Sequence, residues 1–262
     1  MVEFNPAKKA LGQNFLHDQN IIQKILNAFA ARADDTVVEI GPGRGALTEG
    51  LLLSQARLHL IEFDYSLADY WQSRTEQHAT LTVHRGNALK FDYSGLSDGQ
   101  KLRVIGNLPY NISSQILIRL LNNIDCISDI VAMLQLEMVE RIVAGPDNKQ
   151  YGRLSVILQQ SFKAEKLFKV PSGAFHPAPK VESAIVRLMP HNDPELQVND
   201  QKYFSLVVQS AFAQRRKTLR NTLKRIASAQ QLESLGIDPG ARAENLRVVD
   251  FVRLANAREL VG

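Results

Sequence analysis

Short apolar runs alternate with amphipathic stretches through the first 190 residues of the chain. The runs are rich in Val, Ile and Leu and end at glycine, asparagine or charged residues, which is typical of buried strands. The predicted strands are 36–40, 58–62, 81–85, 102–106, 130–136, a segment near 164–170, and 184–189. Apolar residues recur at helical spacing over 21–30. This alternation predicts an α/β domain around a mostly parallel sheet.

The pattern changes at the polar, proline-flanked segment 190–194, after which everything resembles helix. A chain of 262 residues lies near the size of roughly 250 to 300 residues at which one core stops growing. We therefore predict an α/β domain over 1–190, whose N-terminal arm contains Lys8, Lys9 and Gly12, and a small helical domain over 191–262. A helix beginning at Tyr203 would bury one apolar stripe. The stripe comprises Phe204, Val208, Phe212, Leu219, Leu223 and Ile226.

A glycine-rich turn follows the first predicted strand. Gly41, Gly43 and Ala46 fit the spacing of the fingerprint that opens a nucleotide-binding βαβ unit. Glycine lets the backbone approach a ligand, and a helix that starts near Ala46 would aim free N–H groups at it. The fingerprint needs an acid about 20 residues on, and Glu62 ends the second predicted strand. Glu62 is predicted to accept hydrogen bonds from ribose hydroxyls; the alternative is a plain turn and a surface acid.

In an open sheet of this kind, ligands bind outside the carboxyl ends of the strands. The fourth predicted strand is followed by Asn107-Leu108-Pro109-Tyr110. Asn107 offers an amide oxygen, Pro109 has no N–H of its own, and Tyr110 presents a flat ring. Acceptors beside an aromatic ring suit a planar substrate that carries an amino group, such as adenine. Taken alone, the tetrapeptide could also be a turn that closes a strand.

A second aromatic residue, Phe175, stands in the segment 171–181, whose prolines predict a stiff and extended loop. Phe175 and Tyr110 could flank one base, or Phe175 could anchor its own loop. The neighbouring His176 could serve as a general base but is more typical of a solvent-facing loop residue.

The formal net charge is only +4, but the positive charge is unevenly distributed. No acidic residue occurs between Asp200 and Glu233. On a helix, four of the basic residues in this interval share one flank, namely Arg216, Lys217, Arg220 and Lys224. Acids normally accompany bases on a solvated helix face, so their absence favours contact with phosphates over a plain exposed face.

Several classes of protein receive little support from the sequence. The single cysteine, Cys126, excludes an internal disulfide, and the histidines show no metal-ligand spacing. The first residues carry no basic region followed by an apolar stretch, and no apolar run approaches the roughly 20 residues of a membrane span. We expect a cytoplasmic protein with no metal and no membrane partner.

Taken together, these segments resemble one family, the ribosomal RNA adenine dimethyltransferases that use S-adenosylmethionine. The matching segments are Gly12–Leu16, Glu39–Gly43, Glu62, Asn107–Ser113, Phe175–Val181 with Ser183, and Gln214–Thr218. The glycine loop is shared with many methyltransferases, whereas the order and combination are specific. At positions 12 and 108 this chain carries Gly and Leu and so resembles the housekeeping small-subunit enzyme. Macrolide-resistance enzymes commonly carry Ser and Ile at these positions.

The resemblance implies a Rossmann-like class I methyltransferase domain with a small helical domain that contacts RNA. It implies two methyl groups placed on N6 of each of two adjacent adenosines near the 3′ end of 16S rRNA, with a role in small-subunit biogenesis. The implied substrate is rRNA within a pre-30S particle, bound by a monomer.

Roles of individual residues follow from the same resemblance. The implied cofactor-binding residues are Asn14, Leu16, Gly41, Gly43, Glu62, Asn87 and Asn107, with Gln13 nearby. The implied catalytic residues are Asn107, Leu108, Pro109, Tyr110 and Phe175. Asn87 departs from the family, which most often has Asp there, so we expect somewhat looser binding of the cofactor. Ala178 replaces a frequent proline, which bears only on the stiffness of the Phe175 loop.

Three alternatives stay open at this point. An NAD-dependent dehydrogenase would explain the glycine loop and Glu62 but not Asn107–Tyr110 or the acid-free interval. A non-catalytic ribosome-assembly factor on the same fold would explain the basic residues. A large-subunit rRNA methylase of the macrolide-resistance type would differ only in its substrate.

Overall fold

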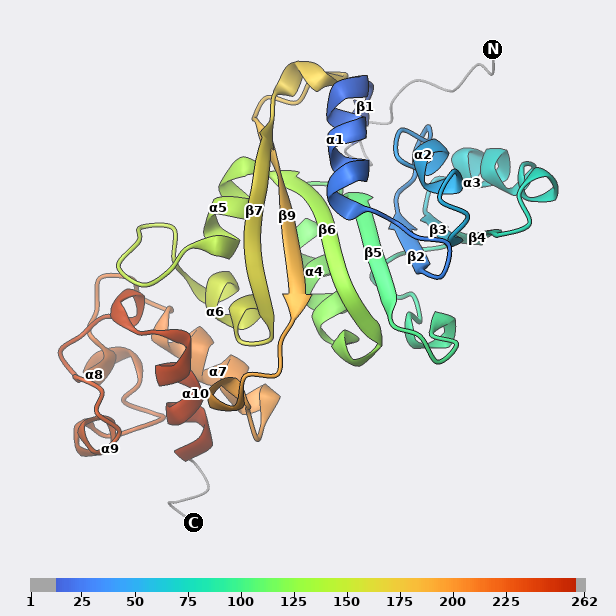
Figure 1. The fold of residues 1–262 in the computed structure, drawn as a ribbon. Helices are drawn as coiled ribbons and strands as arrows, with labels where there is room; N and C mark the ends of the chain where they lie inside the picture. The colour runs from blue at the N-terminus through green and yellow to red at the C-terminus, as the bar shows by residue number, and fades with distance from the viewer. Residues whose placement is uncertain (1–12, 258–262) are drawn as a thin grey trace. The chain divides into compact units, whose positions relative to one another are not determined.

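The computed structural model describes residues 13–257 and forms two compact units (Figure 1). The first unit contains the chain up to Val139 together with Glu165–Pro190, and the second contains Glu140–Ala164 together with the chain from His191. The expected division near residue 190 coincides with one boundary of these units. Residues 140–164 nevertheless belong to the second unit, because the helix α6 (Arg153–Gln159) packs against α7 (Gln201–Ala211).

A seven-stranded sheet forms the centre of the first unit, in the order β4-β3-β2-β5-β6-β9-β7. The strands are β2 Thr36–Ile40, β3 Arg57–Glu62, β4 Leu81–Arg85, β5 Leu102–Asn107, β6 Ile127–Gln135, β7 Phe162–Val170 and β9 Ser183–Pro190. The pairs from β4 to β6 are parallel, and β9 runs antiparallel to β6. All seven predicted strands are present, so the α/β prediction is confirmed.

The order of the strands creates a topological switch point. From β2 the chain proceeds through β3 to β4 on one side, and then returns to β5 on the other side of β2. The ends of β2 and β5 approach closely, since a Cβ placed on Gly106 would lie 2.5 Å from the Ile40 carbonyl oxygen. Ligands of doubly wound sheets bind in the crevice at such a point.

Helices accompany the strands of the first unit (Figure 1). They are α1 Gln19–Phe29, α2 Thr48–Leu52, α3 Tyr65–Gln72, α4 Ser113–Leu121 and α5 Leu136–Val143, the last of which reaches into the second unit. The predicted helix over 21–30 corresponds to α1, which begins after Asp18 because the Asp18 carboxylate accepts the N–H groups of Asn20 and Ile21. Ile22, Ile25 and Phe29 on α1 are buried in the core.

A separate two-stranded sheet joins distant parts of the first unit. Strand β1 (Phe15–Leu16) pairs antiparallel with β8 (Phe175–His176), and Leu16 lies opposite Phe175. The His17 N–H also donates to the Ala174 carbonyl at 2.9 Å. Residues 13–17 are thereby fixed beside the main sheet, whereas Lys8, Lys9 and Gly12 of the predicted arm lie outside the described residues.

Among residues 140–164 and 191–257, which form the described part of the second unit, the regular elements are helices apart from the start of β7. They include α8 Leu219–Thr222, α9 Ala229–Ser234 and α10 Val248–Asn256. The prediction of one helix from Tyr203 to Ile226 is wrong, because α7 ends at Ala211 and α8 begins at Leu219. Like charges four residues apart, Arg216 with Arg220 and Arg220 with Lys224, disfavour a continuous helix, and the Leu219 N–H donates to the Ala241 carbonyl instead. Of the predicted apolar stripe, Phe204, Val208, Leu219 and Leu223 are fully buried, while Phe212 and Ile226 are half-buried.

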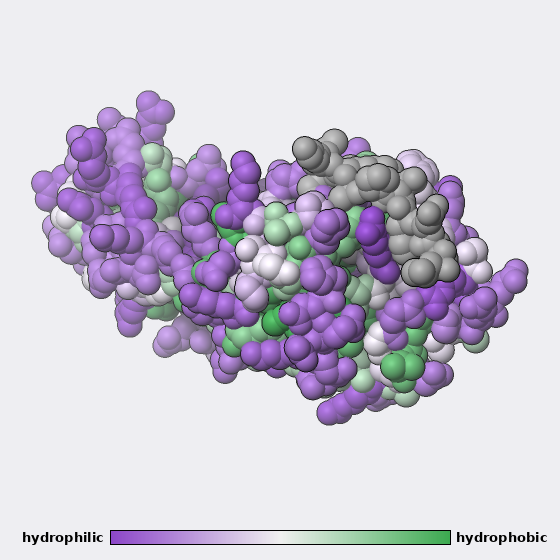
Figure 2. Space-filling view, turned by 90° about the horizontal axis from the view of Figure 1, so that it is seen from above, coloured by the Kyte–Doolittle hydropathy of each residue, from purple (hydrophilic) through white to green (hydrophobic). Residues whose placement is uncertain are grey.

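Hydrophilic residues dominate the face shown in Figure 2, with apolar residues visible between them. Among the helices of residues 13–257, none is long and apolar enough to cross a membrane.

Candidate active site

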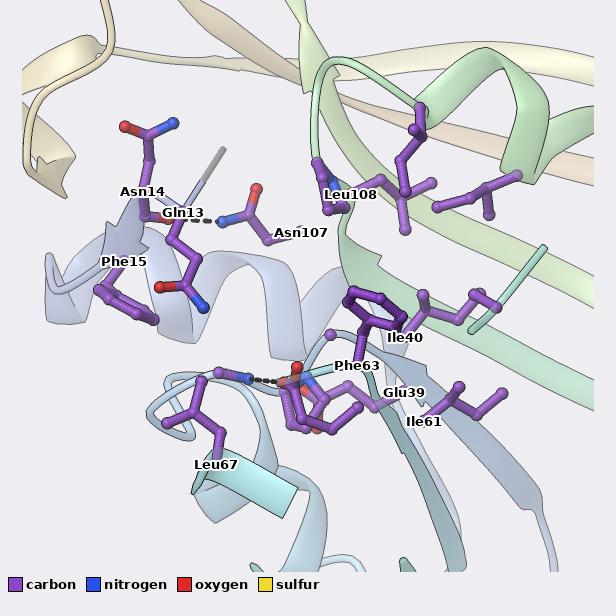
Figure 3. A pocket seen from close by; sticks show the side chains of 18 of the residues that line it. Gln13, Asn14, Phe15, Glu39, Ile40, Ile61, Phe63, Leu67, Asn107 and Leu108 are labelled. Atoms are coloured by element: carbon purple, nitrogen blue, oxygen red, sulfur yellow. Dashed lines mark hydrogen bonds between the residues drawn. The ribbon is translucent and has the colours of Figure 1, made fainter. Parts of the chain in front are cut away.

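A cavity of about 320 Å³ lies at the carboxyl ends of four strands of the first unit (Figure 3). Its lining comes from the segment before α1, from the turns after β2, β3 and β4, and from the segment after β5. These groups are 13–16, 39–44, 61–63, 86–89 and 107–112, with Ala46, Leu47, Leu67 and Ile116. The cavity therefore lies at the switch point and has a volume within the usual range of ligand sites, roughly 300 to 1,000 Å³.

The glycine loop after β2 has the conformation that its sequence predicts. Gly41, Gly43 and Gly45 have φ angles of +69°, +56° and +91°. A Cβ on Gly45 would lie 2.5 Å from the Trp71 ring, and a Cβ on Gly43 would lie 3.2 Å from the Phe15 ring. The Trp71 indole N–H donates to the Gly43 carbonyl at 2.9 Å, so the ring that excludes a side chain also fixes the loop.

Glu62 connects the end of β3 to this loop. One carboxylate oxygen accepts the Gly43 N–H at 3.1 Å and the other accepts the Asp64 N–H at 2.8 Å. The side chain is buried, and this burial raises the pKa of Glu62 while the two backbone hydrogen bonds lower it. A carboxylate oxygen can accept more than one hydrogen bond, so both oxygens can also accept from a ligand.

A second carboxyl group, Glu39, lines the same cavity from within β2. The Thr48 hydroxyl donates to it at 2.7 Å, and only 2% of the residue is exposed. Burial raises the pKa of Glu39 to about 8, and the nearby Glu62 contributes to this rise. Glu39 is therefore mainly protonated and uncharged at neutral pH. Sequence analysis assigned no role to Glu39, although an acidic residue inside an apolar run could have indicated a residue of the site.

Asn107, at the end of β5, is held in a defined orientation. Its amide nitrogen donates to the Asn14 carbonyl at 3.0 Å, as the dashed line in Figure 3 shows. The Asn107 amide oxygen accepts no hydrogen bond from residues 13–257. The next peptide is fixed by the Leu108 N–H, which donates to the Met133 carbonyl at 3.2 Å, while the Leu108 carbonyl has no donor in the same part of the chain. Asn107 and Leu108 thus each present an oxygen at the cavity that accepts no hydrogen bond from the described chain.

Tyr110 lines the cavity and is half-buried. Its hydroxyl lies 2.6 Å from the Ser183 hydroxyl, which is fully buried at the start of β9. Burial raises the pKa of Tyr110, so the phenol is neutral at physiological pH.

Asn87 also lines the cavity, in the turn after β4. Its side-chain oxygen accepts the Leu89 N–H at 2.9 Å. This oxygen has a second lone pair, so it can still accept a hydrogen bond from a ligand.

Phe175 does not line the cavity. The residue is only 3% exposed, because β8 pairs with β1 and the ring packs in the core with Leu16 and Ala174. The prediction that Phe175 and Tyr110 flank one base therefore does not agree with this structure. The other predicted catalytic and cofactor-binding residues all line the cavity.

Phe63 and Arg44 also line the cavity, and sequence analysis assigned neither of them a role. Phe63 follows Glu62 directly and is 55% exposed although it lines the cavity. Arg44 lies over the Phe15 ring, with 4.2 Å between its guanidinium carbon and the ring centroid. Phe63 directly follows the predicted acid Glu62, and this position could have indicated that Phe63 lines the cavity. Nothing in the sequence pattern indicated that Arg44 contacts the Phe15 ring.

The predicted RNA-binding residues lie in the second unit and are exposed. Arg216 and Lys217 stand in the turn between α7 and α8, Arg220 lies on α8, and Lys224 follows it. These four pair with no carboxylate of the described chain, whereas the neighbouring Arg215 pairs with Glu244 at 3.1 Å and donates to the Lys149 carbonyl. Across residues 13–257 there is no group of three or more side chains that could hold a metal ion.

The strand order, the glycine loop, the acid that ends β3 and the cavity at the switch point define an enzyme that binds a nucleotide-type cofactor on a Rossmann-like fold. Comparison with known proteins identifies the family. The sequence pattern of the family described as "Ribosomal RNA adenine dimethylase" matches residues 4–259, and the chain belongs to this family.

Individual relatives agree with this membership. "Ribosomal RNA small subunit methyltransferase A" of Pseudomonas aeruginosa is 49% identical over 95% of this chain and 94% of its own length. The protein of the same name from Francisella tularensis is 50% identical over 95% of this chain and 97% of its own length. The crystal structure of a dimethyladenosine transferase from Plasmodium falciparum is similar with a TM-score of 0.79 and 27% identity, over 92% of this chain and 95% of that one.

Family membership confirms the predicted fold class, the S-adenosylmethionine cofactor and the rRNA adenine dimethyltransferase activity. It excludes the dehydrogenase alternative. The residues present also fit this cofactor: a glycine loop with no side chains can lie beneath an extended ligand, and Glu62 offers acceptors to its hydroxyl groups.

Proposed function

We propose that the protein transfers methyl groups from S-adenosylmethionine to N6 of two adjacent adenosines near the 3′ end of 16S rRNA, giving N6,N6-dimethyladenosine. We further propose that it acts as a cytoplasmic monomer on rRNA within a pre-30S particle and takes part in small-subunit biogenesis. The names of the relatives at 49% and 50% identity support the small subunit as substrate. The observation that carries the chemistry is the Asn107 amide, oriented by Asn14 with its oxygen left unused at the cavity.

The cofactor-binding residues in this proposal surround the glycine loop. Gly41 and Gly43 lie beneath the methionine part, Glu62 accepts from the ribose hydroxyls, and Asn87 lies at the base. Asn14 and Leu16 close the site from the segment before α1. The bound cofactor supplies a methyl group on a positively charged sulfur, which is a good leaving group.

Asn107 and Leu108 activate the acceptor base. The N6 lone pair of adenine is delocalised into the ring, so N6 is a poor nucleophile while its hydrogens lie in the ring plane. The Asn107 side-chain oxygen and the Leu108 carbonyl accept these two hydrogens and turn the lone pair towards the methyl group. Pro109 contributes no competing N–H. As N6 binds the methyl group, the bond from that methyl to the cofactor's sulfur would break and leave a neutral thioether. N6 would then be positively charged and acidic and would release one proton to solvent, so the reaction requires no dedicated general base and positioning supplies most of the catalysis.

Tyr110 holds the extruded adenine by stacking. Each such contact contributes about 1 to 3 kcal/mol in single-strand binding. The hydrogen bond to Ser183 fixes the phenol at its outer end, which restricts the ring to one orientation. After the first transfer one N6 hydrogen remains, so the pocket must readmit a base that already carries a methyl group.

The second unit contacts RNA in this proposal. Arg216, Lys217, Arg220 and Lys224 are exposed and free of carboxylate partners in the described chain, as phosphate contacts require. Phosphate contacts orient the RNA without reading its sequence and make binding sensitive to salt.

Methyl transfer to whole subunits tests the proposed function. Labelled S-adenosylmethionine is incubated with undermethylated small subunits and, in parallel, with large subunits, and the digested nucleosides are identified. Dimethyladenosine from the small subunit alone is the expected result. Product from the large subunit would select the macrolide-resistance type of substrate. Tight binding of cofactor and RNA without any product would favour a non-catalytic assembly factor.

A further inference from the structure

The segment before α1 spans the ends of three strands at the cavity. Asn107, the last residue of β5, donates to the Asn14 carbonyl at 3.0 Å, and the Gln13 side-chain amide donates to the Asp64 carboxylate at 3.1 Å. Asp64 follows β3, and β2 lies between β3 and β5 in the sheet. Two consecutive residues, Gln13 and Asn14, therefore connect the two sides of the switch point across the end of β2.

The Phe15 ring packs on the glycine loop in the middle of this span. A Cβ on Gly43 would lie 3.2 Å from the ring, so the ring closely approaches the loop after β2. Figure 3 shows the Gln13 side chain directed away from Asn107 and towards the side of the cavity where Leu67 of α3 lies. The segment thus has a contact at the end of each of the three strands, and the Gln13 side chain makes the contact after β3.

Asp64 joins this segment to the acceptor proposed for the ribose. Its backbone N–H donates to the Glu62 carboxylate at 2.8 Å. One Asp64 side-chain oxygen caps α3 by accepting the N–H and the hydroxyl of Ser66, at 3.1 and 2.8 Å, and the other accepts from Gln13. Only 4% of Asp64 is exposed, and the residue does not line the cavity. Capping uses one oxygen and does not require the contact with Gln13.

The orientation of the Asn107 amide depends on the position of the Asn14 carbonyl. A side-chain amide has an oxygen that accepts and a nitrogen that donates, and a half turn exchanges the two. With its nitrogen bound to the Asn14 carbonyl, Asn107 keeps its oxygen for a ligand. If that carbonyl moves, the amide can turn and present N–H groups to an adenine amino group, which also carries N–H groups.

We propose, on the basis of the proposed function, that Asp64 is a positioning residue for methyl transfer. Asp64 holds Gln13 and so fixes the backbone of 13–14, and the Asn14 carbonyl in turn fixes the Asn107 amide. The backbone N–H of Asp64 also holds Glu62. Asp64 therefore links the end of the cavity that binds the ribose to the end where the methyl group is transferred, although it lines neither.

Exchange of donor and acceptor between Gln13 and Asp64 tests this role. Gln13→Glu places a second carboxylate opposite Asp64, which removes the hydrogen bond and adds repulsion. Single-turnover transfer to undermethylated small subunits at saturating S-adenosylmethionine should fall by about tenfold or more, because the Asn107 amide loses its fixed orientation. Calorimetric titration of the variant with S-adenosylhomocysteine sets the cofactor concentration that saturates it.

The double variant Gln13→Glu with Asp64→Asn should recover. The amide of Asp64→Asn can donate to the carboxylate of Gln13→Glu, while its oxygen still caps α3. The net charge of the pair is the same as in the unaltered protein. We expect the rate to return to within about threefold of that of the unaltered protein, since the hydrogen bond is restored with its direction reversed.

Gln13→Met is the matched control, because it keeps an unbranched side chain of similar length but provides no carboxylate for Asp64→Asn to bind. Its transfer rate should also fall, and addition of Asp64→Asn should not restore it. Normal transfer by either single variant, or the same response of both to Asp64→Asn, would overturn the positioning role of Asp64. Absence of transfer by the unaltered protein would overturn the proposed function instead.

Discussion

The hydroxyl groups of Tyr110 and Ser183 lie 2.6 Å apart, and they join the segment after β5 to the start of β9. Ser183 is fully buried and cannot replace this partner with water. The hydrogen bond therefore links the orientation of the Tyr110 ring at the cavity to the framework of the sheet.

Removal of this hydrogen bond should slow methyl transfer without affecting the cofactor. In Ser183→Ala we expect transfer to RNA to fall by roughly tenfold, because the stacking ring loses its fixed orientation. The free energy of unfolding should fall by only about 1 kcal/mol. Single-turnover transfer and calorimetric binding of S-adenosylhomocysteine measure the two properties separately.

Tyr110→Phe is the control for this prediction, because it keeps the ring and removes only the hydroxyl. The effects of the two substitutions should not add in the double variant, since both remove one interaction. Additive losses, or normal transfer by Ser183→Ala, would show that the hydrogen bond does not position the ring.

The buried Glu39 should make stability depend on pH. Its pKa of about 8 in the folded protein lies above the ordinary value of 4.5, so between these values the folded state holds a proton that the unfolded chain has lost. Glu39 therefore contributes to the free energy of unfolding at low pH. This contribution decreases by about 1.4 kcal/mol per pH unit as the pH rises from 4.5 towards about 8.

Glu39→Gln isolates this effect, because glutamine can still accept from the Thr48 hydroxyl but does not titrate. Denaturant unfolding from pH 5 to 9 should show the wild type losing stability relative to the variant up to about pH 8, with a constant difference above that pH. Parallel curves for the two proteins would contradict the raised pKa.

The glycine loop should not tolerate a side chain at Gly45. Its φ of +91° disfavours any L-residue, and a Cβ would lie 2.5 Å from the Trp71 ring. We expect Gly45→Ala to destabilise the protein by about 1 to 3 kcal/mol and to weaken cofactor binding, because Trp71 also fixes the loop through Gly43. Thermal unfolding with and without S-adenosylhomocysteine measures both effects. Gly145→Ala, where a Cβ meets open space, should change neither, and equal behaviour of the two variants would count against a steric role for Trp71.

Neutralisation of the predicted RNA-binding residues of the second unit should weaken the binding of RNA but not of the cofactor. Replacement of Arg216, Lys217 and Arg220 by glutamine should lower affinity for 16S rRNA. The slope of log K against log salt should decrease by up to about 0.7 for each phosphate that is no longer neutralised. Affinity for S-adenosylhomocysteine should remain unchanged.

The matched control neutralises three exposed cations of the first unit, Arg32, Lys90 and Lys101, and changes the net charge equally. Equal decreases of RNA affinity in the two triple variants would indicate a general effect of charge. Such a result would contradict direct binding of RNA by Arg216, Lys217 and Arg220.

Local patterns of the sequence were sufficient to predict the sheet and most of the site. The strand Thr36–Ile40 is buried along its whole length, so its apolar run and the glycines after it stood out clearly. Glu62 and Asn107 followed from the rule that ligands bind at the carboxyl ends of parallel strands. Each of these predictions needed only one strand and the residues directly after it.

The features that sequence analysis missed depend on contacts between distant residues. The pairing of Leu16 with Phe175, which buries the Phe175 ring, joins segments about 160 positions apart. The segment that follows the end of α7 at Ala211 is held by one hydrogen bond, from the Leu219 N–H to the Ala241 carbonyl, and by the ion pair of Arg215 with Glu244. Helical periodicity contains no information about such partners.

The oxygen of Asn107 has the central role in the proposed chemistry, because it activates the adenine amino group. The most direct test is single-turnover methyl transfer to undermethylated small subunits by Asn107→Ala at saturating S-adenosylmethionine, with cofactor binding measured by calorimetry. We predict that the transfer rate falls by about 100-fold or more, as when a preorganised hydrogen-bonding group is removed from other active sites. Transfer at a near-normal rate by the variant with its cofactor bound would contradict this role of Asn107.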